Sequence, residues 1–350
     1  MTFSGESEKT TEALLYTQGW SSPSTAPELS FLEEFALEGV TLYVLIAVDG
    51  IGVIENLFVF LLFLQLRRKQ LLTPTAHLML GQQTFFDALS CGLAILVSLD
   101  PFKLISLHGT WNILLCHIWK TQFIYFLAYL YAVYNHCIIS SERLIAIVYS
   151  LHYSRLKNKL WIILVSFYLI MFAYNFPGLF RMNYDFETNT CERTQEYNQI
   201  VQPIDVYNVS TIFFQFLLPL LIMGVTNIMV VFRLKRESKA MQKFGGMHES
   251  AAQSSMHGPN KITEANRALV KISVSLAISF ISTSIFANIF LFLSALDLIT
   301  IPQFSPLGNL TILSANINMT INPILCIVCL PSLRRSITTW FTSKPSQNIW

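Results

Sequence analysis

The sequence Ser141-Glu142-Arg143-Leu144-Ile145-Ala146-Ile147-Val148-Tyr149-Ser150-Leu151-His152-Tyr153 follows a long apolar run that spans residues 123–139. It places an acid beside an arginine where such a run would leave a lipid bilayer. Charges at that depth are costly unless they neutralise each other or face a protein cavity, so they suggest a function. A simpler interpretation is that Arg143 reaches past the hydrocarbon to the lipid head groups. The charged pair alone leaves both interpretations open.

The composition is that of a membrane protein. Of the 350 residues, 53% are hydrophobic and 13% are charged, against about 25% charged residues in a soluble domain. The formal net charge of +2 is too small to indicate nucleic-acid binding, and the six cysteines show no metal-ligand spacing with histidine. The sequence shows neither a glycine-rich phosphate loop nor a nucleophile elbow. We therefore expect neither an enzyme nor a resident cofactor.

Seven apolar runs are long enough to cross a bilayer as helices, which takes about 20 residues each. They cover residues 42–66, 75–99, 118–146, 160–180, 207–232, 269–296 and 307–330. In lipid each backbone polar group must be satisfied within its own segment, and the runs lack the short alternating pattern of barrel strands. The sequence therefore predicts an all-α membrane protein with a seven-helix bundle over residues 41–331.

Basic residues set the expected orientation. Most of the 23 lysines and arginines fall in the loops after the first, third and fifth runs and in the C-terminal tail. The positive-inside rule places these segments in the cytoplasm and the N-terminus outside. Residues 1–40 are acidic, lack the features of a signal peptide, and are expected to be extracellular and disordered. Residues 332–350 are expected to form a cytoplasmic amphipathic helix against membrane lipids, followed by a tail.

Beyond the charged pair, the pattern acid-Arg-x-x-Ala-Ile-x-x-x-Leu-x-Tyr resembles the third helix and following loop of rhodopsin-like G-protein-coupled receptors. The pair Asn322-Pro323 in the seventh run is the other specific part, and the resemblance extends over residues 42–341. It implies a receptor of the plasma membrane that binds an extracellular ligand and activates a heterotrimeric G protein. The residues that it assigns to G-protein coupling are Glu142, Arg143 and Leu151.

The resemblance also implies a polar network inside the bundle. Members of the family gather an asparagine, an aspartate and an Asn-Pro pair around a water-filled pocket that often holds sodium. Ala132 stands where the family supplies a serine, so a sodium ion at Asp87 and a shared polar network without one both remain open. The equivalent residues are Asn56, Asp87, Asn318, Asn322 and Pro323.

Two segments depart from the family pattern. Cys326 replaces the tyrosine that follows the Asn-Pro pair, and residues 283–286 replace the Cys-Trp-x-Pro of the sixth helix. These changes remove an aromatic switch and a kinking proline. A tyrosine-dependent activation switch is therefore not expected here.

At the outer end, the resemblance implies a disulfide between Cys116 and Cys191, although Cys116 lies farther from Arg143 than in the family. Tyr125 stands where amine receptors place an aspartate, which favours a neutral small molecule or a peptide over a biogenic amine. The ligand pocket would be lined by Gln122, Tyr125, Phe126, Tyr129, Phe214 and Asn288.

Other functions remain open at this point. Within the same fold, the protein could be a chemosensory receptor for odorants. From a different class, an ion-conducting or transport protein could use Asp87, although we find no internal repeat of the kind many transporters have. A decoy receptor that binds a ligand without signalling would fit the altered sixth and seventh helices.

Overall fold

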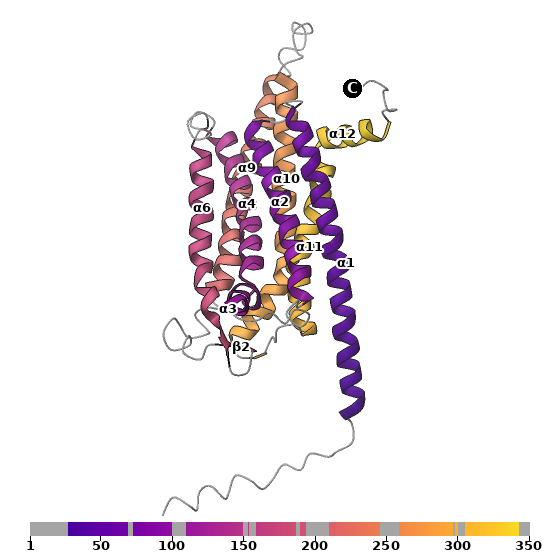
Figure 1. Ribbon diagram of the computed structural model, residues 1–350. Coiled ribbons are helices and arrows are strands. Elements are labelled where there is room, and N and C mark those ends of the chain that lie inside the picture. Colours follow the sequence, from indigo (N-terminus) through magenta and orange to yellow (C-terminus); the bar gives the residue numbers. More distant parts are fainter. Residues whose placement is uncertain are drawn as a thin grey trace, which may run out of the picture.

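The computed structural model describes residues 27–68, 73–99, 110–149, 153, 159–186, 190–193, 210–245, 259–296, 298–299 and 305–342. In this part of the chain, seven helices are long and apolar enough to cross a membrane. They lie side by side in one bundle (Figure 1). These spans are Gly39–Leu66, Pro74–Ser98, Trp111–Val148, Trp161–Phe180, Ser210–Arg236, Arg267–Ser294 and Pro306–Cys329. The predicted seven-helix fold is confirmed.

Short segments interrupt or extend these spans. Within the described ranges, two π-helical segments, η2 and η4, and one 3-10 segment, η3, join the regular helices, and one antiparallel hairpin precedes the fifth span. The elements are α1 (Pro27–Arg68), α2 (Pro74–Ser98), α3 (Thr110–Leu115), η2 (Cys116–Lys120), α4 (Phe123–Val148), α6 (Leu160–Asn175), η3 (Phe176–Arg181), β1 (Met182–Asp185), β2 (Thr190–Arg193), η4 (Phe213–Leu217), α9 (Leu218–Gly245), α10 (Pro259–Ala295), α11 (Pro306–Cys329) and α12 (Pro331–Thr342).

The first helix starts earlier than the sequence predicted. α1 begins at Pro27 and includes residues 27–40, which were expected to be disordered. Proline suits the first turn of a helix, and the leucines, glutamates and alanine that follow it have high helix propensity. Figure 1 shows this part of α1 extending beyond the rest of the bundle. Residues 1–26 lie outside the described part of the chain.

Two spans begin with the same N-terminal motif, a hydroxyl side-chain cap followed by proline. The Thr73 hydroxyl accepts a hydrogen bond from the Ala76 N–H (3.3 Å) at the start of α2, and Pro74 follows. At the start of α11 the Ser305 hydroxyl accepts one from the Gly308 N–H (3.0 Å), followed by Pro306. Side-chain caps satisfy N–H groups that have no partner within the helix, and proline is tolerated there because its missing N–H is not needed.

The third span, predicted as one helix over residues 118–146, is broken near its start. Gln122 has a left-handed backbone conformation, with φ of 57°, and follows the π-helical segment η2. Such a conformation costs about 1–3 kcal/mol for a residue with a side chain. Asn175 of α6 supports the break by donating a hydrogen bond to the Phe123 carbonyl (3.1 Å). The π turn and the break take up extra residues, which explains why Cys116 is farther from Arg143 in sequence than the family pattern expects.

The two ends of the bundle differ in what they carry. α12 lies at one end, and the β1–β2 hairpin lies at the other (Figure 1). We name these the α12 end and the hairpin end. α4 runs between them and packs against α2, α6, α9 and α10. Toward the α12 end the core contains Phe63, Met79, Ile272, Cys326 and Leu333, and Leu333 attaches α12 to the bundle.

Candidate functional site

The α12 end holds a buried ion pair on the last turns of α4. The guanidinium of Arg143 donates to one carboxylate oxygen of Glu142 through its Nε and Nη2. The hydroxyl of Tyr153 donates to the other oxygen, Oε1 (2.6 Å). Glu142 and Arg143 are each only 4% exposed, so the charges compensate each other inside the protein. Arg143 therefore does not reach toward lipid head groups, which was the simpler interpretation.

Tyr153 is half-buried beside the ion pair. Burial, and then its hydrogen bond to Glu142, raises the pKa of the phenol to about 12. The hydroxyl therefore stays protonated and able to donate at neutral pH. The other residue predicted for this end, Leu151, lies outside the described residues.

A second polar cluster, the Ser140–Asn227–Ser273 triad, joins three helices just inside the ion pair. Ser273 of α10 donates to the Asn227 Oδ1 of α9 (2.7 Å), and the Asn227 amide donates to the Ser140 hydroxyl of α4 (3.3 Å). The two serine hydroxyls are 3.0 Å apart and complete a ring of hydrogen bonds. All three side chains are buried. The sequence analysis missed this triad, because single serines in apolar helices often bond to their own backbone instead.

The predicted polar network forms around Asp87, but with other partners as well. The Asn322 amide donates to Asp87 Oδ2 (2.9 Å), and the Gln83 amide donates to Oδ1 (2.8 Å). Asn135 in turn donates to Gln83 (2.9 Å), and the His136 ring lies 3.2 Å from the Asn322 amide nitrogen. Sequence reasoning found the aspartate and Asn322 but not Gln83, Asn135 and His136.

The groups around Asp87 fit a hydrogen-bonded network better than a sodium site. Sodium requires several oxygen ligands, whereas Asp87 is approached by two amide N–H groups. Ala132, which is fully buried, supplies no oxygen from its side chain. No group of three histidine, cysteine, aspartate or glutamate side chains suited to a metal occurs among the residues that the structure describes.

Asn56 compensates for Pro323 instead of bonding to Asp87. Pro323 has no N–H, so the carbonyl of Met319, four residues earlier, lacks its helical partner. The Asn56 amide donates to that carbonyl (3.0 Å) and to the Gly52 carbonyl (2.9 Å). Asn318 is also buried, but its Oδ1 accepts no hydrogen bond from this network or from any other group.

The hairpin half of the bundle brings together three of the six predicted pocket residues. The rings of Tyr125 and Phe126 are 5.3 Å apart between centroids, and those of Tyr125 and Tyr129 are 6.4 Å apart. Phe214 instead packs on Tyr174 of α6, with ring centroids 4.5 Å apart. The remaining two, Gln122 and Asn288, are buried, and the Asn288 amide donates to the Ser284 carbonyl of its own helix (2.7 Å).

An acid that the sequence analysis did not use lies in the same half. Asp49 of α1 is fully buried, and its Oδ2 accepts a hydrogen bond from the Asn316 amide (3.2 Å). The Tyr125 hydroxyl donates to the Oδ1 of the same Asn316 (3.2 Å). The signal was available, because an aspartate within the apolar run 42–66 is itself a reason to suspect function.

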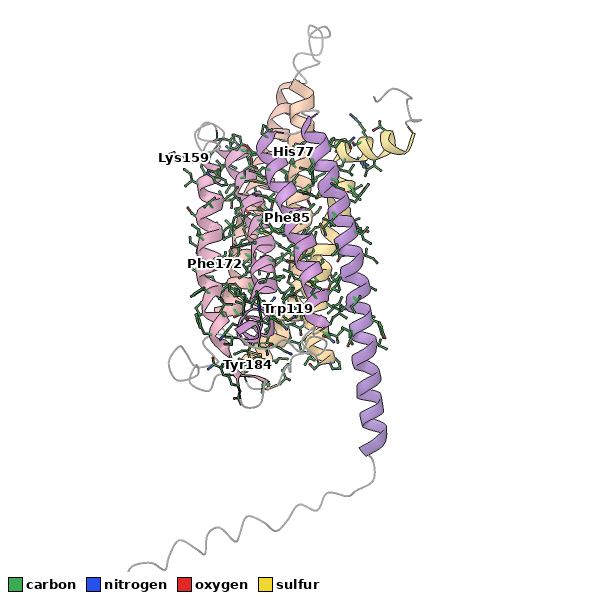
Figure 2. The ribbon with its side chains drawn as sticks, viewed as in Figure 1. His77, Phe85, Trp119, Lys159, Phe172 and Tyr184 are labelled. Atoms are coloured by element: carbon green, nitrogen blue, oxygen red, sulfur yellow. A yellow bond between two sulfur atoms is a disulfide. The ribbon has the colours of Figure 1, made fainter. Side chains whose placement is uncertain are left out.

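The disulfide between Cys116 and Cys191 is formed, with Cα atoms 5.8 Å apart. It ties η2 to β2, and a hydrogen bond from Asn112 to the Tyr184 hydroxyl (2.9 Å) ties α3 to β1. Figure 2 shows Trp119 and Tyr184 near this end, and His77 and Lys159 near the other. The cysteine pairing that the resemblance implied is confirmed.

In the altered sixth and seventh helices, the core contains Phe280, three residues before the changed segment 283–286, and Cys326. Phe280 of α10 is fully buried and lies against Phe216, with ring centroids 6.0 Å apart. Cys326 is fully buried in the apolar core near the α12 end, where the family places a tyrosine. In this arrangement both positions therefore contribute apolar contacts.

Comparison with families of known proteins matches residues 55–325 to the seven-transmembrane receptors of the rhodopsin family. The chain belongs to this family. The matched part runs from α1 to α11 and includes the Glu142–Arg143 pair and Asn322-Pro323. Members of the rhodopsin family are signalling receptors. Together with the seven apolar spans, the family match shows that the chain is a multi-pass membrane protein. No individual characterised protein matches it.

Proposed function

We propose that this rhodopsin-family receptor binds an extracellular ligand at the hairpin end and activates a heterotrimeric G protein at the α12 end, in the plasma membrane. The ion pair of Arg143 with Glu142 carries the proposal. An arginine buried at the end of a central helix, paired with its neighbour and not with lipid, is suited to exchange partners when the helices move.

Two further features support the orientation. The lysines and arginines at the end of α1, in the second half of α9 and at the start of α10 lie on the α12 side (Figure 1), which the positive-inside rule assigns to the cytoplasm. α12 itself is amphipathic, with Leu333 buried against the bundle and Arg334 and Arg335 exposed, as expected of a helix that lies on anionic lipids.

In the proposed mechanism, the ligand binds one arrangement of the bundle more tightly than the other and shifts the equilibrium between them. α10 would move away from α4, which requires the Ser140–Asn227–Ser273 triad to open. Arg143 would leave Glu142 and meet the G protein, with the apolar Leu151 beside it.

A G-protein dissociation assay in cells, with a panel of α subunits and no added ligand, tests this function. We expect Arg143→Ala to abolish the basal signal at matched surface expression. Glu142→Gln should raise it, because the guanidinium loses its charged partner. Lys159→Ala, which alters an exposed cation at the same end, serves as the control and should leave the signal unchanged. A basal signal that is equal in Arg143→Ala and wild type would contradict the proposal.

A further inference from the structure

Asp49 is a fully buried acid of the bundle whose hydrogen-bonding capacity is only partly used. Its side chain is fully buried, yet only Oδ2 accepts a hydrogen bond from an amide, and Oδ1 has no hydrogen-bond partner. A carboxylate has about four acceptor positions, and a buried one normally receives several donors. Among the described residues, no lysine or arginine forms an ion pair with Asp49, so no cation from this part of the chain neutralises it.

The nearby donors of the chain are already engaged. The Tyr125 hydroxyl donates to Asn316, and the Asn316 amide donates to Asp49, so the two bonds form a relay directed toward the carboxylate. The Cys91 thiol also interacts with the Asp49 carboxyl, but a thiol is a weak donor. Both hydrogen bonds of the relay point toward Asp49, so Asp49 is the acceptor at its end. Asp49 lacks a strong, positively charged donor.

The surroundings determine the side from which such a donor could come. One turn farther along α1, Gly52 lies so close to its neighbours that a Cβ there would be 2.7 Å from Thr320 Oγ1 and 2.9 Å from Cys91 Sγ. The helices are therefore closed on the α12 side of Asp49. On the hairpin side, the relay leads to the aromatic rings of Tyr125, Phe126 and Tyr129.

We propose that Asp49, Asn316 and Tyr125 form an anchoring subsite for the protonated amine of an aromatic ligand. Asp49 Oδ1 accepts a charge-assisted hydrogen bond from the ammonium group, and the rings of Tyr125, Phe126 and Tyr129 contact the aromatic body. This inference rests on the proposed function as a ligand-activated receptor and specifies its ligand class. It also revises the preference for a neutral ligand or a peptide, which considered only the position of Tyr125.

Thermal unfolding of the purified receptor, with phenethylamine as the probe, tests the subsite. Ligand that binds only the folded state raises the melting temperature with concentration. We expect phenethylamine to stabilise wild type, and 2-phenylethanol, its neutral isostere, not to do so. Asp49→Asn should weaken the apparent affinity for phenethylamine roughly tenfold or more, which is the value of a hydrogen bond between charged groups.

Glu55→Gln is the matched control, because it removes another carboxylate from α1 while leaving Asp49 intact; it should respond to phenethylamine as wild type does. Asp49→Glu should retain part of the response. The subsite is refuted if wild type shows no stabilisation, if the alcohol works as well as the amine, or if Asp49→Asn responds like wild type. Basal G-protein signalling of wild type separates this failure from that of the receptor function, because an Arg143-dependent basal signal in a receptor that phenethylamine does not stabilise would refute the subsite alone.

Discussion

The two ends of the bundle differ in how completely their buried polar side chains are hydrogen-bonded. Near the α12 end, Glu142 receives Arg143 and Tyr153, and the triad of Ser140, Asn227 and Ser273 closes on itself. In the hairpin half, Asp49 Oδ1 and Asn288 Oδ1 are buried and accept no hydrogen bond. The polar groups named here near the α12 end are thus satisfied within the chain, whereas two buried acceptors of the hairpin half are not.

This difference suggests a division of labour within one receptor. Hydrogen bonds that close between α4, α9 and α10 favour one relative placement of these helices, so they resist opening of the α12 end. A ligand that donates hydrogen bonds to the unpaired buried acceptors of the hairpin half binds with a more favourable free energy, because these acceptors otherwise remain unsatisfied. A ligand can shift the equilibrium only by its difference in affinity for the two arrangements. Each of the following variants tests one side of the comparison.

The largest effect is expected from loss of the disulfide. The double variant Cys116→Ser/Cys191→Ser frees a loop with a sequence separation of 75 residues, which should cost about 4 kcal/mol of unfolding free energy. Thermal unfolding of the purified receptor measures the loss. Cys329→Ser, at a half-buried free cysteine near the other end, should change the melting temperature little. Equal melting temperatures for the double variant and wild type would show that the hairpin end does not need this link.

Gly52→Ala is the next largest. The added Cβ would meet Thr320 Oγ1 and Cys91 Sγ at distances that atoms do not tolerate, so α1 must shift, at a cost of about 1–3 kcal/mol. The shift should also move Asp49 away from Asn316 and weaken amine binding, while leaving the ion pair at Arg143 intact. Gly50→Ala is the control, since its Cβ would meet nothing within 4 Å and alanine favours the helix. If both variants unfold at the same temperature, the close approach of the helices at Gly52 does not contribute to the stability of the receptor.

The sequence was sufficient for those features that depend on local composition or on a specific motif. The seven spans follow from hydropathy because lipid requires each span to satisfy its own backbone. The family could be predicted from Glu142-Arg143 and Asn322-Pro323, because the residues that follow Arg143 also match the family pattern. The disulfide was implied by the same resemblance and needed only two cysteines at one end.

The remaining features depend on contacts between helices that are far apart in sequence. Asn227 and Ser273 are ordinary polar residues until α9 and α10 place them against Ser140. Likewise, the Asn56 amide donates a hydrogen bond to the carbonyl that Pro323 leaves without a helical partner. The spacing of residues in the sequence does not predict this contact. The break at Gln122 is supported by Asn175 of another helix, so local propensity predicted an uninterrupted helix there.

Ser273→Ala tests whether the triad holds the α12 end closed. It leaves the Asn227 Oδ1 buried without its donor, which should cost about 1–3 kcal/mol in the arrangement where the triad is formed. If the triad opens on activation, basal G-protein signalling should rise by severalfold, since about 1.4 kcal/mol changes an equilibrium tenfold. Ser275→Ala is the control on the same helix, where the hydroxyl has only a 3.9 Å contact with Cys329 Sγ. A basal signal that falls or stays constant in Ser273→Ala would mean that the triad does not oppose activation.

Tyr153→Phe should have the smallest effect, because it removes one hydrogen bond from a half-buried position and leaves the ion pair in place. Loss of the bond to Glu142 should cost about 1 kcal/mol and raise basal signalling less than Ser273→Ala does. Tyr149→Phe, at an exposed position at the end of α4, should resemble wild type.

The pH dependence of this difference tests the protonation state of the phenol. The pKa of Tyr153 is raised to about 12 in the folded protein, above its ordinary value of about 10. A group whose pKa is raised on folding contributes stability that is fully present below its ordinary pKa and is lost as the pH rises through the folded value. The difference in melting temperature between wild type and Tyr153→Phe should therefore stay constant from about pH 6 to about pH 9, where the phenol is protonated. A difference that shrinks within that range would mean that the hydrogen bond between Tyr153 and Glu142 is lost or exchanged there, and the α12 end would then be as open to change as the hairpin half.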